Sequence, residues 1–139
     1  MISRAPDVDL FSGTGILGIE ALSRGASRLT FIEQDAKIAA QLNHNLILLN
    51  TDQFNLITTD AISYLKKTNH VFDIIFLDPP FGRHHLRQAG NIIAQRHLST
   101  NFVYIESNSV LAFDSLPDNW QIYRQKKAGR VNYGLITMP

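Results

Sequence analysis

The sequence predicts an α/β protein with a doubly wound, mostly parallel sheet that carries helices on both faces. Short apolar runs of strand length alternate with amphipathic helical segments along most of the chain. A glycine-rich turn joins the first apolar run to the first helical segment. Near the C-terminus, two segments of alternating polarity follow each other around a turn, which predicts an antiparallel hairpin. The 139 residues have the length of one domain, 1–139.

The elements follow from local signals. In the first helix we expect Ile16, Ile19 and Leu22 to share the buried face, and Gly25 to end the helix. Asp35 is the expected N-cap of the second helix, whose apolar residues recur at helical spacing as far as Asn50. The expected strands cover residues 8–11, 29–32, 54–57, 72–77 and 102–106, and the expected helices cover 16–24, 36–50, 61–65 and 86–98.

The hairpin is expected from residues 120–127 and 131–137, with Ala128 and Gly129 as turn material. Five parallel strands followed by an antiparallel pair is the arrangement of the class I methyltransferase sheet. Periodicity alone does not separate this arrangement from other doubly wound folds.

Composition limits the class of protein. A hydrophobic fraction of 45% and a charged fraction of 18% are typical of a soluble globular protein. The absence of cysteine excludes disulfides, thiolate metal sites and cysteine nucleophiles. No signal peptide or membrane span is indicated, so a cytoplasmic location without a membrane partner is expected. With a net charge of only +1, binding to a polyanion needs a local basic patch, for which Lys66-Lys67 and residues 124–130 are the candidates.

The glycine-rich turn predicts a cofactor with a nucleoside part. Gly13, Gly15 and Gly18 follow the first strand and open the first helix, where glycine allows a tight turn and close approach of a ligand. Glu33 ends the second strand about 20 residues on, where a carboxylate can accept hydrogen bonds from both ribose hydroxyls. A dinucleotide-dependent oxidoreductase uses the same glycines and the same acid, so these residues alone leave the cofactor open.

Two further acids favour S-adenosylmethionine. Asp9 lies in the first strand four residues before Gly13, where it can meet an ammonium group rather than a pyrophosphate. Asp60 ends the third strand, where it can accept a hydrogen bond from an adenine amino group. The alternatives are a plain helix N-cap for Asp60 and a satisfied buried acid for Asp9.

Asp78-Pro79-Pro80-Phe81 directly follows the apolar run of residues 72–77 and predicts a site for a planar amino group. The Asp78 carboxylate and a proline carbonyl are acceptors that can hold the two hydrogens of an exocyclic NH2. The prolines fix the loop because their φ is restricted, and Phe81 offers a ring on which a base can stack. The alternative is an ordinary proline turn at the end of a strand.

Other combinations of residues indicate less. His84-His85 has no evident third ligand, so no metal site is expected. Ser12 has no histidine at useful spacing, which argues against hydrolase chemistry. Tyr104 and Tyr133 are expected to pack or to face RNA, and Glu106, at the end of the fifth strand, is a candidate for lining the pocket.

Several motifs in this order resemble a known family, the RsmD-type bacterial methyltransferases, which modify the N2 amino group of a guanine in 16S ribosomal RNA. The motifs are residues 9–15 (Asp9-Leu10-Phe11-Ser12-Gly13-Thr14-Gly15), 18–25, 31–35 and 78–81. The resemblance implies the enzyme class, S-adenosylmethionine as cofactor, and 16S RNA or an assembling small subunit as partner. It implies a catalytic role for Asp78, Pro79, Pro80 and Phe81. It implies a cofactor site formed by Asp9, Phe11, Ser12, Gly13, Thr14, Gly15, Glu33, Gln34, Asp60 and Ala61.

Members of this family carry a segment before the first strand, with an Arg-Pro-Thr motif and a helix that helps to close over cofactor and RNA. Residues 1–6 do not supply such a segment. We therefore expect an exposed apolar patch, a monomer or weak self-association, and salt-sensitive RNA binding. Two alternative functions stay open, namely a catalytically silent domain that binds only the cofactor, and an NAD-dependent oxidoreductase.

Overall fold

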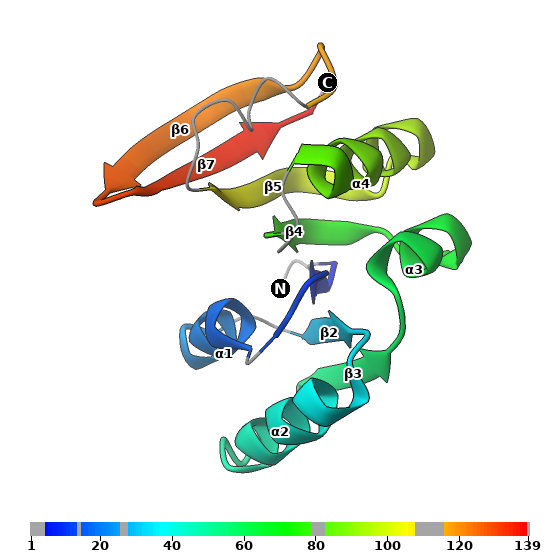
Figure 1. Cartoon of the computed structure of the whole chain (residues 1–139), viewed down its shortest axis with the longest axis vertical. Helices are drawn as coiled ribbons and strands as arrows, with labels where there is room; N and C mark the ends of the chain where they lie inside the picture. Colours follow the sequence, from blue (N-terminus) through cyan, green and yellow to red (C-terminus); the bar gives the residue numbers. More distant parts are fainter. Residues whose placement is uncertain (1–4, 14, 26–27, 79–82, 108–115, 139) are drawn as a thin grey trace.

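A computed structural model of the chain describes residues 5–13, 15–25, 28–78, 83–107 and 116–138. Within them, seven strands form one sheet in the order β3-β2-β1-β4-β5-β7-β6, and four helices lie beside it (Figure 1). The strands are β1 (Asp7–Asp9), β2 (Leu29–Glu33), β3 (Phe54–Thr58), β4 (Phe72–Leu77), β5 (Ser99–Ser107), β6 (Gln121–Ala128) and β7 (Val131–Thr137). The helices are α1 (Ile16–Ser23), α2 (Ala36–Ile47), α3 (Ala61–Lys67) and α4 (Arg83–Arg96).

Strands β1 to β5 are parallel, as the alternation of strands and helices predicted. The order of the sheet reverses at β1, which pairs with β2 on one side and with β4 on the other. Asp9, the last residue of β1, therefore lies between Phe31 and Phe76 of the neighbouring strands. The carboxyl ends of all five strands meet at one edge, which is where open α/β sheets bind ligands.

The C-terminal hairpin is present at the predicted place. Strand β7 pairs antiparallel with both β5 and β6, so it alone opposes the direction of the sheet. Gly129 has a φ of 61° in the turn between the two strands, a value that glycine adopts readily. Every residue of β6 is exposed, because β6 is the edge of the sheet and no helix of the described residues covers it.

Capping residues and close packing explain where the helices lie. The Asp35 side chain accepts from the backbone N–H groups of Lys37 and Ile38, which confirms it as the N-cap of α2. Gly18 brings α1 against β2: a Cβ atom at this position would lie 2.2 Å from the Phe31 ring. The third glycine of the motif is thus required for helix–sheet packing.

The two faces of the sheet have separate cores. Helices α3 and α4 cover one face, with Leu65 and Ile93 buried against the central strands. Helices α1 and α2 cover the other face beside β1 to β3, where Phe31 and Leu42 are buried. No helix of the described residues covers the part of this second face formed by β4, β5 and β7 (Figure 1).

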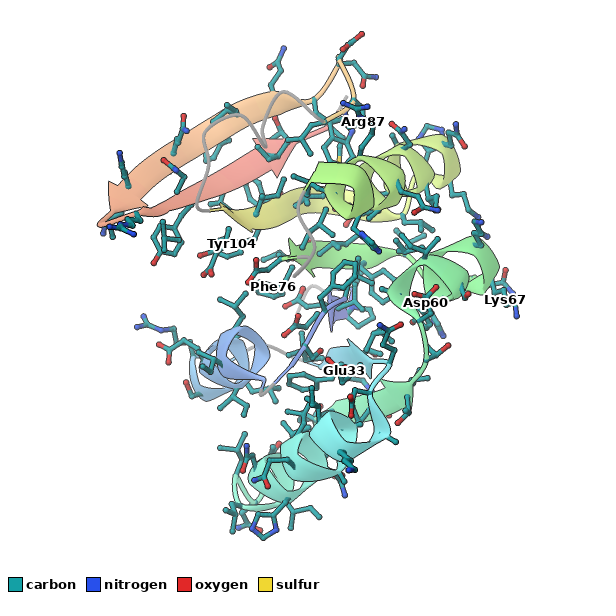
Figure 2. The ribbon with its side chains drawn as sticks, viewed as in Figure 1. Glu33, Asp60, Lys67, Phe76, Arg87 and Tyr104 are labelled. Carbon is teal, nitrogen blue, oxygen red and sulfur yellow. The ribbon has the colours of Figure 1, made fainter. Side chains whose placement is uncertain are left out.

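Aromatic side chains occupy this open part of the sheet. Phe76 and Tyr104 lie side by side, as their labels in Figure 2 show, with ring centroids 5.7 Å apart. The ring centroids of Tyr104 and Tyr133 are 6.4 Å apart. Further along, Phe102 and Tyr123 have ring centroids 5.3 Å apart. These partly exposed rings are the best match to the expected apolar patch, and self-association through them stays a prediction.

Several boundaries and one buried face differ from expectation. The first strand ends at Asp9 instead of residue 11, because the chain turns so that the Ser12 N–H bonds to the Ile32 carbonyl. Helix α2 ends at Ile47, and Asn50, the expected last residue, has a φ of 54°. Ile16 is 75% exposed instead of buried, because the first turn of α1 extends beyond the strands it packs on. Within the described residues, no helix combines the length and apolarity that a membrane crossing requires.

Candidate active site

A cavity of about 620 Å³ lies at the carboxyl ends of the parallel strands. Its volume is in the range of small-molecule sites, about 300–1,000 Å³. Strands β1 to β5 all contribute to its wall through their last residues or the residues just beyond. The predicted site residues that line it are Asp9, Phe11, Ser12, Gly13, Glu33, Gln34, Asp60, Ala61 and Asp78.

Glu33 organises the glycine turn at one end of the cavity. Its Oε1 accepts from the Gly13 N–H at 2.9 Å, and its Oε2 accepts from the Asp35 N–H at 2.9 Å. Gly13 has a φ of 55°, and no other atom lies within 4 Å of the place where a Cβ would be. The turn is thus fixed by one carboxylate while its surface stays open to a ligand.

Ser12 and Gly15 of the glycine-rich motif have structural roles. The Ser12 hydroxyl donates to the Asp9 carbonyl at 2.8 Å and accepts from the Ile32 N–H at 3.1 Å, so it ties β1 to β2. Gly15 does not line the cavity; a Cβ there would lie 2.2 Å from Leu42 Cδ1. Thr14 lies outside the described residues.

Asp60 caps a helix and also lines the cavity. Its Oδ2 accepts from the backbone N–H and the hydroxyl of Ser63, at 2.9 and 3.1 Å, so it is the N-cap of α3. Asp60 and the next residue, Ala61, also line the cavity. Asp60 and Glu33, which lines the same cavity, are both labelled in Figure 2. The N-cap interpretation is confirmed, and it leaves the adenine interpretation available.

Asp9 is the most perturbed group of the site. It is 2% exposed, and its Oδ2 has no hydrogen-bond partner among the described residues. Burial raises the pKa of Asp9 to about 7, with smaller contributions in the same direction from Asp78, Glu33 and Glu106, while the Gly18 N–H opposes the rise. Among the described residues, this oxygen is therefore not satisfied, in contrast to what the alternative of a satisfied buried acid expects.

Asp78 and Glu106 stand at the ends of β4 and β5. Burial, followed by repulsion from Glu106, raises the pKa of Asp78 to about 6. Glu106 lines the cavity, as the sequence suggested, and its Oε1 accepts from the Tyr104 hydroxyl at 3.0 Å. Burial and the bond to Glu106 raise the pKa of Tyr104 above its ordinary value. Pro79, Pro80 and Phe81 lie outside the described residues.

Some lining residues were not predicted. Ile16 and Ile38, in the first turns of α1 and α2, face the cavity instead of the core, and Ile38 is 39% exposed. The sequence predicted Ile16 on a buried face and counted Ile38 only among the apolar residues at helical spacing, because periodicity alone does not show which apolar residues lie beyond the edge of the sheet. His85 also lines the cavity. No group of three potential metal ligands occurs among the described residues.

The order of the strands and the cavity at their carboxyl ends define the class I, Rossmann-like methyltransferase fold, and solved structures agree. A putative methyltransferase, yhhF, from Escherichia coli superposes with a TM-score of 0.84 at 34% identity, over 96% of this chain and 76% of that chain. A putative methylase, HI0767, from Haemophilus influenzae has a TM-score of 0.79 at 33% identity, over 96% and 86%.

The chain belongs to the RsmD family of methyltransferases. The family described as "Conserved hypothetical protein 95" matches residues 1–137. The ribosomal RNA small subunit methyltransferase D of Escherichia coli (strain K12) is 35% identical over 137 residues, which are 97% of this chain and 69% of that protein. The protein of the same name from Buchnera aphidicola (subsp. Baizongia pistaciae) is 37% identical, over 96% of this chain and 70% of its own length.

Proposed function

We propose that this protein methylates the N2 amino group of a guanine in 16S ribosomal RNA and uses S-adenosylmethionine as the methyl donor. The observation that carries the proposal is the position of Asp78, directly after the central strand β4 and at the wall of the same cavity as Glu33 and Asp60. One cavity thus combines a nucleoside end with a carboxylate suited to an amino group. Family membership favours this function over the oxidoreductase that the glycine motif alone left open.

The residues present fit the proposed cofactor. The unpartnered Asp9 Oδ2 is a buried acceptor that a cationic ammonium group would satisfy. Glu33, Asp60 and Ala61 line the same cavity, which supports a role for Glu33 in binding the ribose hydroxyls and for Asp60 and Ala61 in binding the adenine. Gln34 and Ile38 both line this cavity, and Ile38 offers an apolar surface for the adenine ring, which the polar Gln34 does not. When bound, S-adenosylmethionine supplies a methyl group on a positively charged sulfur, which an amine nitrogen can take by direct displacement.

The role of Asp78 follows from the chemistry of the guanine amine. This nitrogen is a poor nucleophile because its lone pair is delocalised into the ring. As acceptors, Asp78 and the Pro79 carbonyl turn the amine hydrogens out of the conjugated geometry and stabilise the positive charge that develops on nitrogen. With a pKa of about 6, Asp78 is mostly ionised at neutral pH and is also able to take the released proton.

The substrate must present an unstacked guanine. A base inside a continuous duplex cannot reach a cavity at the end of a sheet, so a loop or partly assembled RNA suits the site better. The relatives are named for the small ribosomal subunit, which supports 16S RNA or an assembling subunit as partner.

The test is transfer of a tritiated methyl group from S-adenosylmethionine to two substrates: protein-depleted 16S RNA, and small-subunit particles that lack the modification. We expect label in at least one of them, and nuclease digestion followed by mass spectrometry should place it on guanine N2. Label on another base or another atom would contradict the proposed specificity. Binding of S-adenosylhomocysteine without transfer to either substrate would instead support a catalytically silent domain.

A further inference from the structure

The carboxylates of Asp78 and Glu106 lie at the ends of adjacent strands. The proposed methyl transfer gives a role to Asp78 and none to Glu106. Strands β4 and β5 are parallel and in register, with Phe76 opposite Tyr104 and Leu77 opposite Ile105. Asp78 and Glu106 are the next residues of each strand, and both line the cavity. Adjacent parallel strands direct such residues to the same face. Two acids from adjacent strands thus line one cavity.

Glu106 is held in place by its neighbours. The Tyr104 hydroxyl donates to Glu106 Oε1 at 3.0 Å. The Tyr104 ring packs in turn beside Phe76, which Figure 2 labels next to it, and beside Tyr133. The ring centroids are 5.7 and 6.4 Å away. An ionised carboxylate has about four acceptor positions, so the tyrosine uses one and leaves the others for a ligand. This is how a preorganised acceptor is built.

The balance of polar groups at this end restricts the ligand. Asp9, Asp78 and Glu106 are all acceptors when ionised, and no lysine or arginine lines the cavity among the described residues. A ligand that fits must bring hydrogen-bond donors. If Asp9 meets the cofactor's cation, Asp78 and Glu106 remain for the base.

Guanine has the matching edge. Its ring N1–H and its exocyclic NH2 are neighbouring donors, whereas adenine has an acceptor at N1 that would face a carboxylate lone pair. We propose that Glu106 is a specificity-determining residue that accepts the N1–H of the target guanine while Asp78 accepts from the amino group. This inference rests on the proposed function and adds to it the means by which the base is chosen.

A role for Glu106 in reading N1–H and a role for Asp78 alone predict different results with 2-aminopurine. 2-Aminopurine carries the same exocyclic amine as guanine but has an acceptor at N1. If only Asp78 and the proline loop grip the amine, 2-aminopurine should be methylated with the same relative efficiency by wild type and Glu106 variants. If Glu106 reads N1–H, removal of its charge should selectively favour the analogue.

The experiment uses 16S RNA ligated from segments, with guanine or 2-aminopurine at the methylated position, assembled into small-subunit particles. The readout is the ratio of kcat/KM for the two particles. We expect Glu106→Gln to reduce the preference for guanine by about 10- to 100-fold, the effect of one hydrogen bond to a charged group. The glutamine amide can donate to the analogue's N1, which acts in the same direction. Tyr104→Phe, which frees Glu106 but keeps the ring, should give an intermediate ratio.

Two controls separate the outcomes. Glu20→Gln removes an exposed carboxylate that pairs with Arg24 on α1, outside the cavity, and should leave the ratio unchanged. Binding of S-adenosylhomocysteine by calorimetry shows that each variant keeps its cofactor end. An unchanged ratio in both Glu106→Gln and Tyr104→Phe would overturn the inference while guanine methylation stands. Failure of the wild type to methylate guanine N2 would instead overturn the proposed function.

Discussion

The acidic side chains at the two ends of the cavity differ in their hydrogen bonds and pKa values. We name the ends by their proposed occupants: the nucleoside end has Glu33 and Asp60, and the reaction end has Asp9, Asp78 and Glu106. At the nucleoside end, Glu33 and Asp60 accept hydrogen bonds from the chain's own backbone, so they are satisfied without a ligand. At the reaction end, Asp9 is buried and Asp78 is half-buried beside Glu106, and burial together with repulsion between neighbouring carboxylates raises the pKa of both aspartates. The first end is thus preformed, and we expect the second to become electrostatically favourable only when ligands bring cations and N–H groups. Perturbed groups of this kind are typical of functional sites.

The largest effect should come from the reaction end. Asp78→Ala removes the acceptor that polarises the amine, so we expect kcat to fall roughly 10²- to 10³-fold, the scale for one preorganised transition-state partner. Cofactor affinity should change little, because Asp78 lies at the other end of the cavity. Single-turnover methylation at saturating cofactor and RNA measures the loss, with Asp52→Ala as an exposed acidic control. Equal rates in wild type and Asp78→Ala would remove this residue from the mechanism.

The nucleoside end should show the reverse pattern. Glu33→Ala loses both the expected ribose contact and the hydrogen bonds that hold the Gly13 turn. We expect S-adenosylhomocysteine affinity to fall about 10- to 100-fold, as for the loss of hydrogen bonds to a charged group, with kcat at saturation much less affected.

Glu33→Gln is the matched variant. It keeps one acceptor oxygen but turns an NH2 group toward a backbone N–H, so its affinity should lie between wild type and Glu33→Ala. Unchanged affinity in the alanine variant, measured by calorimetry, would show that Glu33 serves the turn alone.

Sequence predicted the nucleoside end better than the reaction end, for a physical reason. Glu33 acts on Gly13 and Asp35 through local strand–turn–helix geometry, which the glycine motif already encodes. The reaction end depends on the sheet order, which places β4 beside β1 and brings Asp9 close to Asp78 although they are far apart in sequence.

The hydrogen bond between Tyr104 and Glu106 could not be predicted from the sequence. Alternation along β5 puts the two residues on one face of the sheet. The structure adds that no helix of the described residues covers this face there, and that the Tyr104 hydroxyl donates to Glu106. Likewise, the exposure of Ile16 and Ile38 depends on where the sheet ends. The fold class and the succession of strands along the chain were predictable, whereas the balance of polar groups in the cavity was not.

A third region tests whether the contrast is confined to the cavity. Lys126 and Lys127 are exposed on the edge strand β6, and neither lines the cavity. Replacing both by glutamate should weaken RNA binding and reduce the slope of log K against log salt by about 2, one for each lost phosphate contact.

Cofactor affinity should stay as in wild type in this double variant. The matched comparison is Lys66→Glu/Lys67→Glu at the end of α3, where Figure 2 shows Lys67 pointing away from the sheet. Equal salt slopes in wild type and the β6 variant would exclude this edge from the RNA surface.

The smallest expected effect, and the most direct test of the contrast between the two ends, is the release of protons when the cofactor binds. Asp9 has a pKa of about 7 against 3.8 for an ordinary aspartate, so near pH 7 about half of the free protein carries a proton there. A cation bound beside Asp9 favours the ionised form and lowers this pKa, so binding must release up to about half a proton at pH 7. By linkage, affinity should rise with pH up to about 7 and level off above it. Calorimetry in buffers of different ionisation enthalpy measures the release, which Asp9→Asn should abolish and Asp78→Asn should largely keep. If the wild type binds S-adenosylmethionine without releasing protons, the unpartnered oxygen of Asp9 is not where the ammonium group binds.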